Sequence, residues 1–244
     1  MEIRTIDSDR TPIWQRIFGD GDPGARLEGA VAELLRPGSG SAGVVHGAWC
    51  HVVDRRGPLM LSALLHRPGN GGPVEVRSVH PYSESGYLWP LRLQLVERSS
   101  DGGTAAVMGK SGPAAIGLFD TMHFRSRYED DVEYSFQVSG IALALQRETL
   151  PETYAADFCG YGSMRLVSLD PQQPADVIEL HSVVQAVQQV DFWGTKLTRY
   201  LLTIAKLGDA DLTFDVYGND EVVGRYAVGD RVAGHVWVFG FAPM

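Results

Sequence analysis

The most constraining feature of this sequence is the stretch from Gly43 to the C-terminus, where strand-like runs follow one another with almost no helical periodicity. β-Branched and aromatic residues, which favour strands, alternate with polar residues in many of these runs. Turn signals at 68–72, 101–103 and 218–220 separate many of them. Long strands joined by tight turns favour an antiparallel sandwich or barrel over an α/β fold, so we predict a mainly β protein.

The predicted strands fall into two groups on either side of residue 150. The first group is 44–53, 59–66, 74–79, 87–97, 104–108, 114–124 and 132–147. The second group is 164–168, 177–190, 196–206, 212–217, 221–226 and 231–241. Apolar side chains occupy both alternating sets of positions in the last of these runs, which indicates a central strand that is buried on both faces.

A helix precedes the β structure. Asp22 is a typical N-cap, Pro23 suits the first helical position, and an apolar stripe runs from Leu27 to Leu35. A shorter turn is expected around Trp14 and Ile17. The Gly/Ser segment 38–43 is expected to be a flexible linker between the helix and the β structure. We therefore expect three parts: an N-terminal helical segment at 1–38, a first β unit at 39–150 and a second β unit at 151–244.

Two segments suggest an internal duplication. At an offset of 100, four residues of 132–142 recur in 232–242, and a shared Phe-Asp pair in 117–120 and 212–215 matches only at a different offset. Two unrelated hairpins with valine alternation would give the same pattern, so that interpretation stays open.

The segment 226–232, Tyr-Ala-Val-Gly-Asp-Arg-Val, resembles the Gly-Asp-x-Val step of oligonucleotide/oligosaccharide-binding (OB) and related small barrels. This resemblance implies OB-like barrels with a binding face on strands and loops, and it does not fix the ligand.

The charge balance and the N-terminus limit the classes of partner. The 244 residues include 21 Lys and Arg against 30 Asp and Glu, a net charge of −9, which disfavours non-specific nucleic-acid binding. All basic residues except Lys110, Lys196 and Lys206 are arginine, a bias that we associate with GC-rich bacterial coding. No secretory signal pattern opens the sequence, and its longest apolar run is far below the ~20 residues that span a bilayer. We expect a cytoplasmic bacterial protein with reduced thiols and no membrane segment.

Aromatic and arginine residues supply the candidate binding site. Aromatic residues gather at 82–89, 192–193 and 237–241, and arginines lie near them in the sequence. Arginine next to aromatic rings can form stacking surfaces for bases, sugars or peptides, or an interface with a second copy. The alternative is an aromatic core with arginine at its rim. The candidate binding residues are Trp89, Arg92, Trp193, Arg199, Arg225, Arg231, Trp237 and Phe239.

No metal, cofactor or catalytic motif is predicted. On one continuous strand, His46 and Cys50 would share a face and His51 would point to the other, so only two donors would converge where zinc needs about four. No Gly-x-Ser-x-Gly motif occurs, and the serine, histidine and aspartate residues are too scattered to select a triad.

We therefore predict a non-enzymatic bacterial binding or assembly protein that acts through an aromatic and arginine sheet face or a self-association surface. One alternative is a hydrolase or lyase with a pocket between the β units, which requires convergence of several of His46, His51, Asp120, His123 and Glu133. Another is an OB-type single-stranded nucleic-acid binder, which requires an arginine-lined strip flanked by aromatic rings despite the net negative charge.

Overall fold

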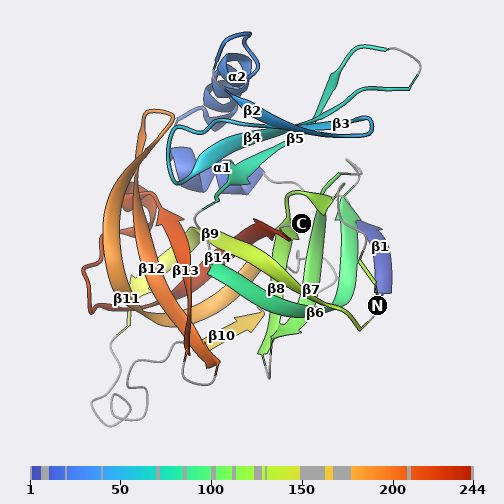
Figure 1. Cartoon of the computed structure of the whole chain (residues 1–244). Coiled ribbons are helices and arrows are strands. Elements are labelled where there is room, and N and C mark those ends of the chain that lie inside the picture. Colours follow the sequence, from blue (N-terminus) through green and yellow to red (C-terminus); the bar gives the residue numbers. More distant parts are fainter. Residues whose placement is uncertain are drawn as a thin grey trace.

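Two β-sheets and a short helical segment near the N-terminus make up the computed structural model, which confirms the prediction of a mainly β protein (Figure 1). The structure describes residues 2–6, 11–19, 21–39, 41–69, 72–84, 87–99, 103–111, 114–123, 128–129, 131–148, 163–166, 177–207 and 210–242. Cys159 lies outside these residues.

Within the described residues the helices are α1 (Thr11–Phe18), α2 (Pro23–Leu34) and the short α4 (Asp220–Val223). Four strands form one antiparallel sheet, the small sheet: β2 (Ala42–His46), β3 (Trp49–Val53), β4 (Met60–His66) and β5 (Glu75–Tyr82). The other ten strands of the described ranges form the large sheet: β1 (Glu2–Ile6), β6 (Tyr87–Ser99), β7 (Ala105–Ser111), β8 (Ala114–Asp120), β9 (Glu133–Arg147), β10 (Ser163–Leu166), β11 (Val177–Phe192), β12 (Thr195–Leu207), β13 (Ala210–Gly218) and β14 (Arg231–Phe241).

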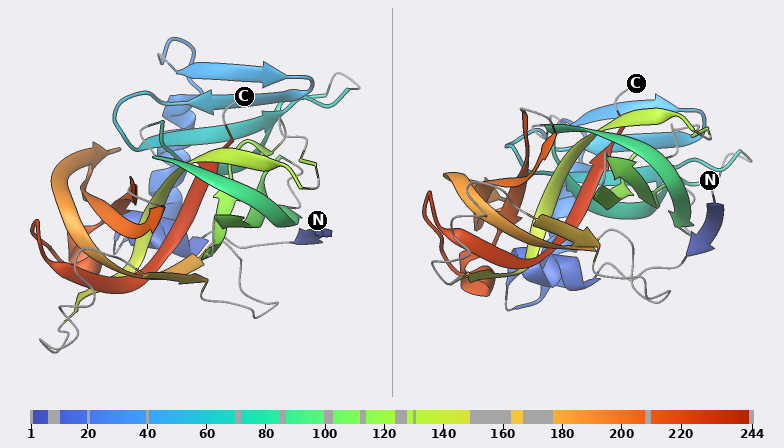
Figure 2. Two further views of the ribbon diagram at one scale, coloured as in Figure 1. Left: turned by 60° about the horizontal axis from the view of Figure 1, so that its bottom comes forward. Right: turned by 90° about the horizontal axis from the view of Figure 1, so that it is seen from below.

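The large sheet closes on itself twice, because β9 and β14 each pair with strands on both sides. Ring 1 runs β9–β6–β7–β8–β14, and ring 2 runs β14–β11–β12–β13–β9. The two rings share β9 and β14, which pair with each other and cross the middle of the molecule in both views of Figure 2. Strands before and after residue 150 therefore belong to one sheet, while the division into units at that residue stays a prediction.

The strand pairing repeats about a pseudo-two-fold axis between β9 and β14. Starting from a shared strand, each ring has three antiparallel neighbours in turn and closes with a short parallel pairing onto the other shared strand. Ser139 lies opposite Phe239, exactly 100 positions away, and the flanking pairs exchange Val138↔Gly240 with Gly140↔Val238. The strand pairing thus repeats about this axis, and the internal duplication itself stays a prediction.

The Phe-Asp match is out of register by one residue in the structure. Phe119 is the partner of Phe239, whereas Asp215 is the partner of Ser139. The pseudo-axis therefore equates Phe119 with Asp215, and it equates Leu118 with Phe214, which both face the ring interiors. The parallel strand pairing determines which positions correspond between the two rings, and the shared Phe-Asp sequence would align them one residue differently.

Two buried layers hold the chain together. One fills the interiors of the rings and includes Trp89, Phe136 and Phe214. The other joins the small sheet, α1 and α2 to the outer side of the rings and includes Leu61, Trp237 and Phe239. Figure 1 shows the small sheet as a separate layer across the rings, with α2 beyond it. Burial of both faces of β14 confirms the prediction of a central strand.

The helix at the N-terminus follows the sequence prediction closely. The Asp22 side chain accepts a hydrogen bond from the Ala25 N–H at 2.9 Å, as an N-cap does, and Pro23 is the first residue of α2. The expected short turn before it is the eight-residue helix α1, in which Trp14 and Ile17 are buried.

Two predicted strands were wrong. The run 44–53 is a hairpin, because Gly47 adopts a left-handed φ of 59° and reverses the chain between β2 and β3. Val45, not His46, is therefore the partner of Cys50. The run predicted at 221–226 begins instead with α4, because the Asn219 side chain accepts from the Glu221 N–H at 3.0 Å and starts a helical turn. The Gly229–Asp230 turn does precede β14; the wider OB resemblance stays a prediction.

Candidate functional site

Three of the eight candidate binding residues are core residues. Trp89 is fully buried inside ring 1, where its indole N–H donates to the Thr213 carbonyl at 3.4 Å. Trp237 and Phe239 stack on each other with ring centroids 5.1 Å apart, between the rings and the small sheet. The structure therefore does not place these three rings on a shared surface. Strand alternation identifies opposite faces, but it does not tell which faces a second layer covers.

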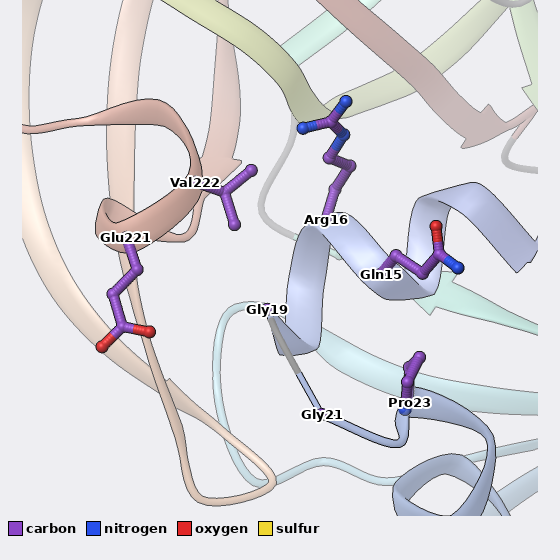
Figure 3. A pocket seen from close by; sticks show the side chains of 7 residues that line it. All are labelled: Gln15, Arg16, Gly19, Gly21, Pro23, Glu221 and Val222. Atoms are coloured by element: carbon purple, nitrogen blue, oxygen red, sulfur yellow. The ribbon is translucent and has the colours of Figure 1, made fainter.

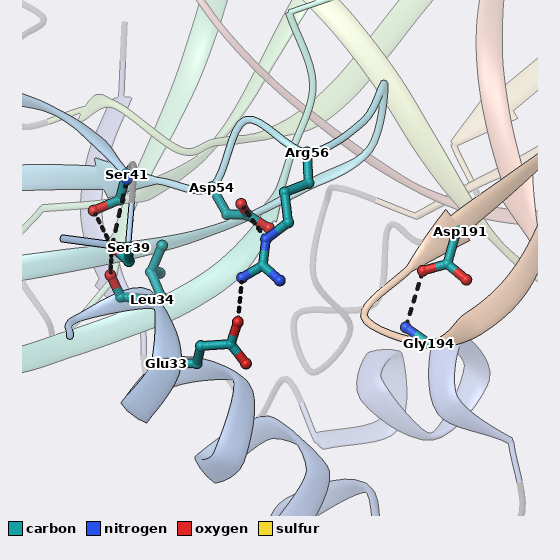
Figure 4. A network of polar contacts seen from close by, with 8 residues as sticks. All are labelled: Glu33, Leu34, Ser39, Ser41, Asp54, Arg56, Asp191 and Gly194. Carbon is teal, nitrogen blue, oxygen red and sulfur yellow. Dashed lines mark hydrogen bonds and ion pairs between the residues drawn. The ribbon is translucent and has the colours of Figure 1, made fainter.

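Trp193 lies at the tip of the β11–β12 hairpin, where it joins two layers. It has a left-handed φ of 50° and forms a two-residue turn with Gly194. The Arg56 guanidinium lies 4.0 Å from the centre of the Trp193 ring. Arg56 also pairs with Asp54 at 2.8 Å and with Glu33 of α2 at 3.0 Å (Figure 4). The hydrogen bond to Asp54 is the main cause of the raised pKa of Arg56.

Three of the candidate arginines lie on separate elements. Arg92 is exposed on β6, where its cross-strand partners are Lys110 and Glu133. Arg225 follows α4 and donates to the Asp220 carboxylate at 2.7 Å. Arg231 is partly buried at the start of β14. These positions do not form one strip along a single sheet face.

Arg199 is the candidate residue that lies in a concave site. The register places it on β12 between Gln188 of β11 and Tyr217 of β13. Its guanidinium donates to the Asp215 carboxylate at 2.7 Å and to the Gln188 side-chain oxygen at 3.0 Å. The hydrogen bond to Asp215 is the main cause of the raised pKa of Arg199. Asp215 is fully buried, which places this ion pair at the base of the site. The two opposite charges leave the pair without net charge.

A groove of about 140 Å³ surrounds this ion pair, and we call it the ring 2 groove. Tyr87 stands at its edge at the beginning of β6, with 44% of the residue exposed. The groove is lined by Tyr87, Ala186, Val187, Gln188, Arg199, Leu201 and Asp215. It combines an aromatic ring, an arginine and aliphatic side chains on a sheet surface. The sequence indicates Arg199 and the aromatic run 82–89 that contains Tyr87, but it does not group the lining residues into one site, because strand register alone brings them together.

The ring 2 groove occupies a defined place relative to the pseudo-two-fold axis. One row of direct cross-strand partners crosses six strands: Ala106, Phe119, Phe239, Ser139, Asp215 and Leu201. The ring 1 half of this row is apolar and buried, and the Phe119 ring contacts His80 of β5 in the small sheet. Its counterpart in ring 2 includes Asp215 and Leu201, both of which line the groove.

The residues named for an enzyme pocket come together only in part. His123 Nδ1 lies 3.6 Å from Asp120 Oδ2, and the Tyr128 hydroxyl donates to the same carboxylate oxygen. The separation of His123 and Asp120 exceeds the length of a hydrogen bond. His51 stacks on His80, while His46 and Glu133 are exposed on β2 and β9. The structure thus brings together Asp120 and His123 and leaves the two exposed residues apart from them.

Among the residues that the structure describes, no three His, Cys, Asp or Glu side chains group as metal ligands. No helix within the described ranges has the length and apolar character needed to cross a membrane. Comparison with known proteins finds no matching family model, no matching curated protein and no matching solved structure.

Proposed function

We propose that this chain is a non-enzymatic assembly protein that associates with a second copy of itself through the ring 2 groove. The observation that carries the proposal is the relation of the groove to the pseudo-two-fold axis. On ring 1 the row through Ala106 and Phe119 is buried, with the small sheet against it. On ring 2 the equivalent row ends at a groove with partly exposed aliphatic and aromatic side chains.

The size of the groove favours one inserted side chain. Small-molecule sites generally enclose about 300–1,000 Å³, whereas this groove encloses about 140 Å³. Its base carries no net charge, because Arg199 and Asp215 neutralise each other. Val187 and Leu201 add an aliphatic wall. An uncharged aromatic side chain suits these surroundings, since it can pack on aliphatic groups and stack on a guanidinium.

The groove carries a side chain of this kind at its own edge. Tyr87 is 44% exposed beside the groove. In a two-fold contact, one copy can place Tyr87 in the groove of the other and receive the partner's ring in return, because the same patch serves both copies. The neutral base also brings two chains of net charge −9 together at a point without local like-charge repulsion.

This arrangement favours assembly over the two alternative functions. A single-stranded nucleic-acid binder needs arginines available for phosphates, whereas Arg199 and Arg225 are each held by a carboxylate. A hydrolase or lyase needs an acid–base pair in a cleft, and the described residues that line the groove include only Asp215 and Arg199 as a charged pair.

The test is sedimentation of the full chain over a range of concentrations, with Val187→Glu as the main variant. Val187 is exposed and lines the groove, so the substitution leaves the core intact and places a charge in the contact. We expect a wild-type dimer and a largely monomeric V187E, because an unpaired charge is costly to bury.

Val45→Glu is the matched control, since Val45 is exposed on β2 of the small sheet. We expect V45E to dimerise like the wild type. A monomeric wild type, or a dimer that V45E disrupts and V187E leaves intact, would overturn the proposal.

A further inference from the structure

A larger cavity lies where α1 meets α4, on a different part of the molecule from the ring 2 groove. It encloses about 600 Å³ and is lined by Gln15, Arg16, Gly19, Gly21, Pro23, Glu221 and Val222 (Figure 3). This volume is within the range of small-molecule sites, about 300–1,000 Å³. None of its lining residues belongs to the ring 2 groove.

The fold builds this cavity from two segments about 200 positions apart. Helix α1 ends at Phe18. The next residue, Gly19, turns the chain with a left-handed φ of 72°, and its N–H donates to the Gln15 carbonyl at 2.9 Å. The buried Asn219 side chain donates to the Ile17 carbonyl at 3.0 Å and accepts from the Glu221 N–H at 3.0 Å. Asn219 thus holds α4 against the end of α1 and fixes both walls.

Opposite charges stand on the two walls. Figure 3 shows Arg16 extending from α1 and Glu221 from α4. Within the described part of the chain, neither side chain forms an ion pair or a hydrogen bond. The adjacent carboxylate, Asp220, is instead held by Arg225 and by the Thr198 hydroxyl.

The backbone at the end of α1 does not compete for a ligand. The Ile17 carbonyl accepts from Asn219, and the Phe18 carbonyl accepts from Arg26 at 3.1 Å. The Glu221 carboxylate is therefore the negative group that a cationic ligand would meet, and the Arg16 guanidinium is the positive group for an anionic one. Gln15 adds an amide that can donate and accept.

We infer that this cavity binds a small zwitterion of the amino-acid or short-peptide class. Arg16 binds its carboxylate, since the planar guanidinium matches two carboxylate oxygens. Glu221 binds its ammonium group, and Gln15 is placed to hydrogen bond to a peptide unit. The ligand thereby satisfies two charges that the described residues leave without a partner. This inference does not depend on self-association, because the two sites share no residue.

Isothermal titration calorimetry with three related ligands tests the assignment on the full chain. Alanyl-alanine carries both charges, its N-acetyl form lacks the ammonium group, and its C-terminal amide lacks the carboxylate. We expect each blocked form to bind about tenfold more weakly, since one charge-assisted hydrogen bond is lost in each case. Equal binding of all three ligands, or no binding of alanyl-alanine at millimolar concentration, would overturn the inference.

Two variants assign each charge to its ligand group. Arg16→Gln should abolish the preference for a free carboxylate and keep the preference for a free ammonium group. Glu221→Gln should do the reverse. Arg36→Gln and Glu28→Gln make the same changes of charge at exposed positions of α2 or just after it, outside the cavity, and should retain both preferences. Variants R16Q and E221Q that keep the wild-type preferences would exclude this geometry.

Discussion

Ser139 of β9 and Phe239 of β14 lie directly opposite each other at the pseudo-two-fold axis of the large sheet. On the Phe239 side the row continues to Phe119, and on the Ser139 side it continues to Asp215. The apolar half needs a covering layer, because exposed aromatic surface is costly in water. The polar half carries its own ion pair instead. The strand order therefore repeats about the axis, whereas the small sheet lies against only the apolar half of this row.

The close approach of β9 and β14 at the axis predicts that Gly240→Ala destabilises the fold. A Cβ on Gly240 would lie 2.1 Å from the Gln137 carbonyl oxygen, so the shared strands would have to separate. We expect a loss of about 1–3 kcal/mol or more, as for other insertions into packed cores. Gly69→Ala is the control, since no atom lies within 4 Å of its Cβ position. Denaturant unfolding should give a lower free energy for G240A than for G69A; equal values would contradict the packing argument.

The Arg199–Asp215 pair predicts a large effect from a single substitution. Arg199→Met removes the guanidinium that lies 2.7 Å from the fully buried Asp215 carboxylate, and breaking such a pair typically costs about 3–5 kcal/mol. Arg225→Met breaks a pair whose arginine is 83% exposed, where about 1 kcal/mol or less is expected. Unfolding of both variants at neutral pH measures the contrast, and equal losses would count against a structural role for Asp215.

The sequence allows local features to be predicted better than the contacts between layers. The bounds of β14 and the Asp22 N-cap follow from patterns of a few residues, and both are confirmed. Trp237 lies in the core because a separate sheet covers its face, and alternation within β14 carries no information about that sheet. The cavity between α1 and α4 joins residues about 200 positions apart, so no local pattern indicates it. Aromatic neighbours in the sequence indicate Arg199, while its partner Asp215 comes from the register of another strand.

Arg56 should contribute to the docking of α2 and the small sheet on ring 2. Its guanidinium stacks on Trp193 and pairs with Asp54 and Glu33, so Arg56→Met removes contacts to α2, to the β11–β12 turn and within its own loop. We expect a loss of about 1–2 kcal/mol, the sum of a cation–π contact and partly exposed ion pairs. Arg55→Met is the neighbouring control, because Arg55 has one exposed pair, with Glu84. A thermal midpoint as high for R56M as for R55M would show that this contact does not stabilise the fold.

Gly19 lies next to Asn219, the residue that holds α4 against α1 and so fixes the walls of the α1–α4 cavity. Gly19→Ala places a side chain at a φ of 72° and 3.2 Å from the Asn219 side-chain nitrogen, which holds α4 in place. Gly38→Ala imposes a similar left-handed penalty at a φ of 81°, of about 1 kcal/mol, with no atom within 4 Å. Any excess loss in G19A therefore measures the crowding of Asn219, and we expect that excess together with weaker binding of alanyl-alanine. G38A should keep wild-type binding. If both variants lose the same stability and bind equally, Asn219 adapts freely, and the position of α4 does not depend on a glycine at the end of α1.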